Sequence, residues 1–166
     1  RKLVTKNAKK IEKKFENPAA ILQEIPVEKI AEFQRVVLAF YAKNARALPR
    51  RETENPREIF VSEFMLQQTQ VSRVIPKFLA FVEKFPAPED AASAGFEEIF
   101  AVWQGLGFNR RAKFLWEAAG EIVEKFGGKI PKKYEELRSL PGVGDYTARA
   151  VLAFAWNEEI PVIDIN

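Results

Sequence analysis

Apolar side chains recur every three or four residues along most of the chain, which is the spacing of one face of an α-helix. The pattern predicts helices over residues 27–45, 57–70, 71–85, 97–104, 110–126, 131–140 and 146–156. Pro76 is expected to break or kink the third helix, and Pro86 with Pro88 to form a turn. The strict alternation of apolar and polar residues that is typical of strands is absent. We therefore predict an all-α fold.

The N-terminal segment, residues 1–26, differs from the rest of the chain in its charge. The first fifteen positions carry seven lysine or arginine residues and one glutamate, a net +6, which leaves −3 for the remainder of a chain whose total is +3. A solvated helix or loose tail is one interpretation of this segment, and a basic arm that binds DNA is the other. Because overall basicity is weak evidence here, local clusters of charge must support any nucleic acid binding.

The composition excludes several kinds of site. The 166 residues are 47% hydrophobic and contain neither cysteine nor histidine, so we expect a globular core without disulfides, cysteine–zinc sites or serine–histidine nucleophiles. No apolar run approaches the roughly 20 residues that cross a membrane, and no signal peptide follows Arg1. The composition therefore favours an intracellular protein whose chemistry depends on carboxylates, amides, hydroxyls and lysines.

A glycine-rich turn between two predicted helices is the first candidate binding site. Pro141 ends the preceding helix, while Gly142 and Gly144 permit a tight turn and leave the backbone open to a ligand. The next helix presents free N–H groups at the positive end of its dipole, an arrangement that binds phosphate. Arg110 and Arg111, at another predicted helix start, could add to such a site or could simply be solvated. An ordinary turn that uses glycine for geometry alone is the alternative for the hairpin.

Two carboxylates stand among mostly apolar neighbours. Glu63 is either a surface ion-pair carboxylate or a partly buried acid whose raised pKa suits a proton donor. Asp164 is either the N-cap of a later helix or the second member of a catalytic pair. On either side of a glycosidic bond, one acid could protonate the leaving group and the other could face the oxocarbenium carbon. Sequence spacing alone does not bring the two together.

The hairpin sequence at 140–148, followed by Val162, Ile163 and Asp164, resembles the helix-hairpin-helix DNA glycosylase superfamily. The segment 61–71, VSEFMLQQTQV, closely resembles the adenine DNA glycosylase branch, and the match covers about residue 30 to the end. This resemblance implies a DNA glycosylase of base-excision repair, which acts on double-stranded DNA with a mismatch or an oxidised guanine.

The same resemblance implies a domain organisation. Residues 50–166 would form a six-helix-barrel domain that is incomplete at its C-terminus, with the helix-hairpin-helix at 134–156. The helix within 27–49 would pack with a missing half that carries a four-cysteine [4Fe-4S] cluster. The chain would then be an N-terminal fragment of a longer, monomeric protein.

Individual roles also follow from the resemblance. Glu63 would protonate N7 of an adenine flipped out opposite 8-oxoguanine or guanine, and Asp164 would stabilise the oxocarbenium ion. Tyr146 stands where relatives with strand-cleaving activity carry a lysine, which implies a glycosylase without lyase activity. Gln67, Gln68 and Thr69 would wedge into the duplex, and Gly142, Val143 and Gly144 would bind the phosphates of one strand, where Arg110 and Arg111 could add their charge. Arg46 and Leu48 would line the base pocket. The main-chain carbonyls of Arg138, Leu140 and Val143 would hold Na⁺ or K⁺.

Two departures from the family pattern stand out, and two other functions stay open. Phe108–Asn109 replaces a common pair of tyrosines, and Asp145 is an acid beside the phosphate-binding turn. Removal of adenine mispaired with oxidised guanine or guanine is the predicted activity. A thymine or uracil glycosylase that acts on mismatches with guanine is the close alternative. A helix-hairpin-helix fragment that binds DNA without catalysis is the alternative from another class.

Overall fold

A computed structural model describes residues 25–45 and 53–163, and these ranges contain helices and no strand, which confirms the predicted all-α class. The chain divides into two compact units, residues 1–46 and 47–166. The described part of the first unit contains helix α3 (Val27–Asn44), which has no buried residue. Across the described ranges, every helix is too short or too polar to cross a bilayer.

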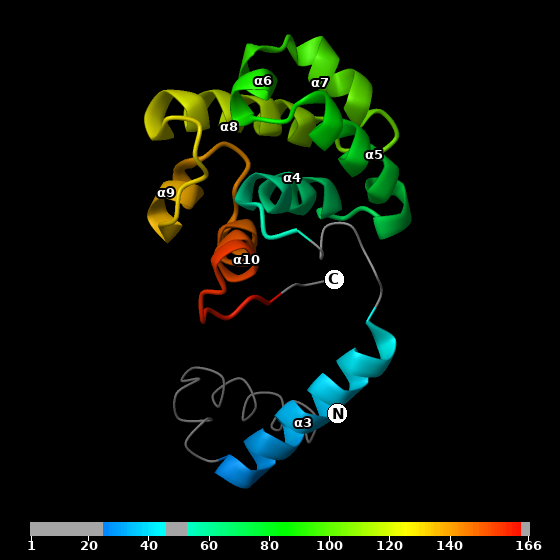
Figure 1. Ribbon diagram of the computed structural model, residues 1–166, viewed down its shortest axis with the longest axis vertical. Helices are drawn as coiled ribbons and strands as arrows, with labels where there is room; N and C mark the ends of the chain where they lie inside the picture. The colour runs from blue at the N-terminus through cyan, green and yellow to red at the C-terminus, as the bar shows by residue number, and fades with distance from the viewer. Residues whose placement is uncertain (1–24, 46–52, 164–166) are drawn as a thin grey trace, which may run out of the picture. The chain divides into compact units, whose positions relative to one another are not determined.

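The second unit is organised around one enclosed helix (Figure 1). Its helices are α4 (Pro56–Leu66), α5 (Val71–Lys84), α6 (Pro88–Ser93), α7 (Phe96–Trp103), α8 (Arg110–Phe126), α9 (Tyr134–Ser139) and α10 (Asp145–Trp156). Helix α4 packs against α5, α8 and α10. Helices α6 and α7 pack on α8, and helix α9 packs on α10. The second unit therefore surrounds α4 with other helices.

The sequence of α4 explains its central position. Its residues 59–65 are all buried, so this helix has no solvent-facing side along that stretch, in contrast to an ordinary amphipathic helix. The rings of Phe60 and Phe64 lie 4.9 Å apart, centroid to centroid, and contribute to the core. At the N-terminus, Asn55 Oδ1 accepts a hydrogen bond of 3.0 Å from the N–H of Arg57, and Pro56 occupies the first helical turn. These signals start α4 where the sequence predicts.

Helix bounds differ from the predicted ones where proline and distant contacts intervene. Helix α5 runs through Pro76 without ending there, because burial of its apolar side chains Val74, Phe78 and Phe81 offsets the cost of a proline within a helix. The predicted turn at Pro86–Pro88 is followed at once by α6, with Pro88 in its first turn and Asp90 accepting a 2.8 Å bond from the N–H of Ala87. Helix α8 has its predicted bounds and ends at Gly127, whose left-handed conformation stops it.

Candidate functional site

Glu63 lies near the C-terminal end of α4 and is only 2% exposed. Ser62 beside it is also buried, and its hydroxyl donates to the carbonyl of Ile59 at 2.8 Å, so the helix itself satisfies that group. Burial of a carboxyl group inside an apolar helix bundle is costly, and positions where proteins accept this cost are often functional. Of the two alternatives for Glu63, the surface ion pair does not fit this burial.

The end of α4 is held by the guanidinium of Arg111, at the start of α8. This side chain donates five hydrogen bonds, two of them to carbonyls in the last turn of α4. The acceptors are the main-chain oxygens of Phe64 (2.9 Å), Met65 (3.1 Å), Leu106 (3.4 Å) and Gly107 (3.3 Å), and Oγ1 of Thr69 (2.8 Å). A cation at a helix C-terminus binds the unpaired carbonyls and faces the negative end of the dipole. Arg111 thus joins α4 to the two loops at 67–70 and 104–109.

This placement corrects the DNA contact predicted for Arg111. The residue is 8% exposed, its guanidinium lies 5.3 Å from the ring centroids of both Trp103 and Phe108, and burial lowers its pKa from the usual value. Its Nη1 and Nη2 groups already donate to protein acceptors and its Nε is buried, so it cannot reach a phosphate without opening the core. The neighbouring Arg110 is exposed and stacks on Phe114 at 4.9 Å, which keeps it available as a surface cation.

The loop after α4 contains the three residues predicted as a duplex wedge, and the structure gives them different environments. Helix α4 ends at Leu66, so the helix predicted over residues 57–70 is too long, and Gln68 lies beyond it, exposed and with φ of +51°. Gln67 Nε2 instead donates to Oγ1 of the buried Thr147 on α10 at 3.2 Å. Thr69 donates to the carbonyl of Gln67 at 3.1 Å and accepts from Arg111. Gln67 and Thr69 therefore brace the loop, and Gln68 projects from it.

Phe108, which sequence reasoning did not place in the site, matches Gln68 in two respects. It is 61% exposed, and its φ is +47°, a conformation that is costly for a bulky side chain. The carbonyl of the adjacent Gly107 accepts from Trp103 Nε1 at 3.1 Å and from Arg111, which fixes the loop that carries Phe108. Its sequence signal was a large apolar residue between Gly107 and Asn109, where a buried role is not expected. Two strained, exposed side chains thus stand on the loops that Arg111 joins.

The predicted glycine hairpin connects α9 to α10 and is anchored by two buried residues. Leu140 and Val143 are 2% and 5% exposed, whereas Gly142 and Gly144 between and beyond them are exposed. The N–H of Val143 donates to the carbonyl of Leu140 at 3.2 Å, which closes the turn. Helix α10 then begins at Asp145, so its first N–H groups emerge next to the exposed glycines.

The two hairpin glycines have different reasons to be glycine. Gly142 has φ of +74°, and a Cβ there would lie 2.6 Å from the Cβ of Phe114, so the fold itself requires glycine. Gly144 has φ of −86°, which any residue adopts, and a Cβ there would have no neighbour within 4 Å. The fold does not require glycine at Gly144, and the space beside it is open to an external group.

Asp145, the unexpected acid at the hairpin, is paired on the surface. Its Oδ1 accepts from Tyr134 Oη at 2.5 Å and from Arg149 Nε at 3.0 Å. The hydrogen bond from Tyr134, and then that from Arg149, hold the pKa of this carboxyl below its usual value, while the hydrogen bond to Asp145 raises the pKa of Tyr134. Arg149 also lies 5.2 Å from the Tyr134 ring centroid. The negative charge of Asp145 is therefore offset locally by a cation.

The main-chain carbonyls predicted to hold a monovalent cation do not fit that ion. Arg138 Nη1 donates to the carbonyl of Val143 at 2.6 Å, and the carbonyl of Leu140 accepts from the N–H of Val143. A metal ion on Val143 O would lie next to a guanidinium, and the two like charges would repel each other. The described residues also contain no group of three or more carboxylates that could hold a metal ion, and the whole chain has no cysteine for a cluster.

Several predicted site residues lie outside the described ranges. Asp164, Arg46 and Leu48 are among them, so the distance between the two predicted catalytic acids and the lining of the base pocket stay predictions. Tyr146 lies in the first turn of α10 and is partly exposed.

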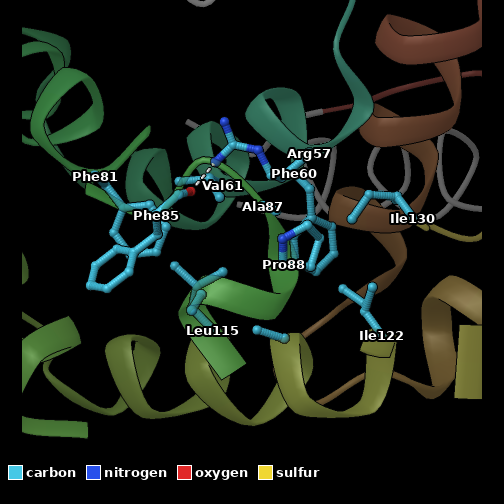
Figure 2. Close-up of a pocket in the computed structure, with 12 residues that line it drawn as sticks. Arg57, Phe60, Val61, Phe81, Phe85, Ala87, Pro88, Leu115, Ile122 and Ile130 are labelled. Carbon is cyan, nitrogen blue, oxygen red and sulfur yellow. Dashed lines mark hydrogen bonds between the residues drawn. The ribbon is translucent and has the colours of Figure 1, made fainter. Parts of the chain in front are cut away.

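A small apolar pocket lies elsewhere in the second unit, between α4, α5, α6 and α8 (Figure 2). Arg57 borders it and donates to the carbonyl of Phe85 at 2.6 Å, and burial lowers the pKa of this arginine. None of the predicted site residues lines this pocket. The features described above gather instead at the C-terminal end of α4 and around the hairpin.

Comparison with known proteins agrees with this arrangement. Residues 61–166 match the HhH-GPD superfamily of base excision DNA repair proteins. An adenine DNA glycosylase of Mycolicibacterium smegmatis is 44% identical over 131 residues, which are 78% of this chain and 45% of that protein. The human adenine DNA glycosylase is 39% identical over 149 residues, 84% of this chain and 27% of that protein. The chain thus spans less than half the length of these relatives.

Solved structures give the same fold. A thermostable thymine-DNA glycosylase superposes with a TM-score of 0.78 at 30% identity, over 82% of this chain and 64% of that one. Endonuclease III in a non-covalent DNA complex superposes with a TM-score of 0.71, and at 22% identity it supports the fold alone, over 85% of this chain and 65% of that one. With its family match across most of the second unit, its all-helical core and its glycine hairpin, the chain belongs to the HhH-GPD superfamily of base excision DNA repair proteins.

Proposed function

We propose that this chain contains the catalytic core of an adenine DNA glycosylase, which hydrolyses the N-glycosidic bond of adenine mispaired with 8-oxoguanine or guanine. The observation that carries this proposal is Glu63, a buried acid on the enclosed helix α4 and one turn before a loop braced against α10. The identity to adenine DNA glycosylases across 78–84% of the chain supports the choice of base.

In the proposed reaction, Glu63 donates a proton to N7 of the flipped adenine. The C1′–N9 bond then breaks and its electrons stay on the base, which leaves as neutral adenine. Asp164 stabilises the positive charge on the sugar, and water adds to C1′ as its proton passes to the Glu63 carboxylate. Tyr146 has no amine with which to form a Schiff base, so the reaction ends with an intact strand and an abasic site.

We expect the DNA contacts to come from the hairpin and from the loops that follow α4 and precede α8. The N–H groups at the start of α10 bind a backbone phosphate beside Gly144, where the open space admits it. Gln68 and Phe108 enter the duplex at the mismatch and fill the space left by the extruded base, because both project from braced loops. Arg110 adds a phosphate contact from its place over Phe114.

The test is release of free adenine from a duplex with a single adenine opposite 8-oxoguanine, followed by chromatography. We expect Glu63→Gln and Asp164→Asn to lose turnover while largely keeping duplex affinity, and Glu124→Gln on the exposed face of α8 to behave as wild type. Salt-sensitive binding without base release, unchanged in both acid variants, would instead establish a DNA-binding module without catalysis.

A second candidate substrate is supported by one observation. The thermostable thymine-DNA glycosylase shares 30% identity and a TM-score of 0.78 with this chain. A panel of duplexes with adenine opposite 8-oxoguanine or guanine, and thymine or uracil opposite guanine, separates the two activities. Release of thymine or uracil but not adenine would favour this candidate over the first.

The proposal extends to a longer protein. The exposed apolar side chains of α3 would pack with a further domain that holds a [4Fe-4S] cluster, for which the present residues offer no cysteine. These side chains belong to Phe33, Val36, Val37, Leu38, Phe40 and Tyr41. We propose that the protein acts as a monomer on double-stranded DNA inside the cell.

A further inference from the structure

One peptide group in the hairpin has an unusual pair of neighbours. Its carbonyl belongs to Val143 and accepts a 2.6 Å hydrogen bond from the guanidinium of Arg138, while its N–H belongs to the exposed Gly144 and, in a trans peptide group, is directed opposite to that carbonyl. Charge-assisted hydrogen bonds of this length are among the stronger ones in proteins. A cation on the carbonyl polarises the peptide group and makes its N–H a better donor to an anion.

Arg138 is well suited to remain on this carbonyl. Its guanidinium is tethered at the last turn of α9, only five residues before the carbonyl that it binds, and its planar donors suit a carbonyl acceptor. Two other charged side chains at the start of α10, Asp145 and Arg149, pair with each other. The guanidinium of Arg138 therefore brings a single positive charge to the carbonyl of Val143, as one bound Na⁺ or K⁺ would.

We infer that Arg138 takes the place of a monovalent metal ion in this hairpin, so that the hairpin binds a DNA phosphate without Na⁺ or K⁺. The inference rests on the proposed DNA binding at the hairpin. Arg138 polarises the Val143–Gly144 peptide group from inside the turn, and the phosphate binds the N–H on the other side. A metal ion would be repelled from the carbonyl that the guanidinium occupies.

The experiment measures the affinity of the full chain for a fluorescent duplex with an abasic-site analogue opposite 8-oxoguanine. Titrations are done at equal ionic strength in potassium chloride, sodium chloride and tetramethylammonium chloride, whose cation is too large to bind between carbonyls. We expect the wild-type Kd to agree within about twofold among the three salts. Arg138→Met should bind about tenfold more weakly in tetramethylammonium chloride, with most of the loss restored by potassium.

Two further variants make the result specific. Arg138→Lys keeps the charge and a donor, so it should remain largely independent of the metal ion. Arg35→Met on the exposed face of α3 removes the same charge from the first unit and should show no selective response to potassium. The melting temperature of each variant, measured in the same salts, establishes that Arg138→Met is folded before binding is compared.

The outcomes separate the inference from the function on which it rests. A wild-type Kd that worsens severalfold in tetramethylammonium chloride would overturn the inference while leaving DNA binding intact. The inference also fails if Arg138→Met binds as wild type does in every salt, or is weakened equally in all of them, since Arg138 would then be dispensable or a plain phosphate contact. Absence of duplex binding by the wild type in every salt would refute the proposed function as well.

Discussion

Replacement of Arg111 by methionine tests whether this residue holds the core or contacts DNA. The change removes three short hydrogen bonds, to Phe64, Met65 and Thr69, and two longer ones. If each short bond contributes about 1–1.5 kcal/mol and the long ones little, the free energy of unfolding should fall by about 3–5 kcal/mol. Two carbonyls at the end of α4 would also lose their partner, which favours the upper part of that range.

Urea unfolding followed by circular dichroism measures this loss, provided that the slope with urea is unchanged. Arg111→Lys should recover only part of the stability, because one ammonium group cannot reach all of these acceptors. The matched control is Arg110→Met at the adjacent exposed position, which should change stability by less than about 0.5 kcal/mol but weaken duplex binding. The reasoning is refuted if Arg111→Met costs under about 1 kcal/mol, or if Arg110→Met destabilises the protein as much.

Four other substitutions probe the hairpin and the strained loop that carries Phe108. Gly144→Ala should unfold like the wild type but bind duplex about tenfold more weakly. Gly142→Ala should lose at least about 1–2 kcal/mol of stability, because its φ is positive and its Cβ would meet Phe114. Equal effects of the two variants on stability and on binding would contradict this separation. Asp145 has a pKa below its usual value, so its ionised form stabilises the fold at neutral pH and this contribution disappears as the pH falls through the folded-state pKa. Melting curves should therefore show a steeper loss of stability below about pH 4 for the wild type than for Asp145→Asn, and parallel curves would argue against the network. Phe108→Ala should weaken binding to an abasic-site duplex by about 1–3 kcal/mol, measured by fluorescence anisotropy, with an unchanged urea midpoint; unaltered affinity would remove Phe108 from the interface.

Helices with regular apolar spacing and local end signals could be predicted from the sequence. The bounds of α8 agree with prediction because apolar spacing and Gly127 mark them within the segment itself. The end of α4 could not be predicted in this way, because Gln67–Gln70 are compatible with a helix. A guanidinium some forty-five residues later in the chain binds the last carbonyls of that helix.

The candidate site shows the same division. The hairpin and Glu63 carry local sequence signals, and the structure places both on the elements expected, whereas Gln68 lies in a loop after the predicted helix has ended. Arg110 and Arg111 look alike in the sequence, yet Arg110 lies on the surface and Arg111 in the interior. Successive residues of a helix point in different directions, and only Arg111 lies on the buried face of α8. The hydrogen bond from Arg138 to the carbonyl of Val143 depends on the hairpin turn, which places that carbonyl beside the C-terminal end of α9.

The enclosure of α4 has a consequence for how the protein responds to heat and to redesign. Helix α4 carries seven successive buried residues, so its amide protons should exchange at the slowest rates in the second unit. Thermal inactivation and global unfolding should then follow one curve, without a folded but inactive stage. Any substitution beside Glu63 that is meant to change the pKa of this acid also changes the packing of the core, because the same eleven-residue helix supplies both.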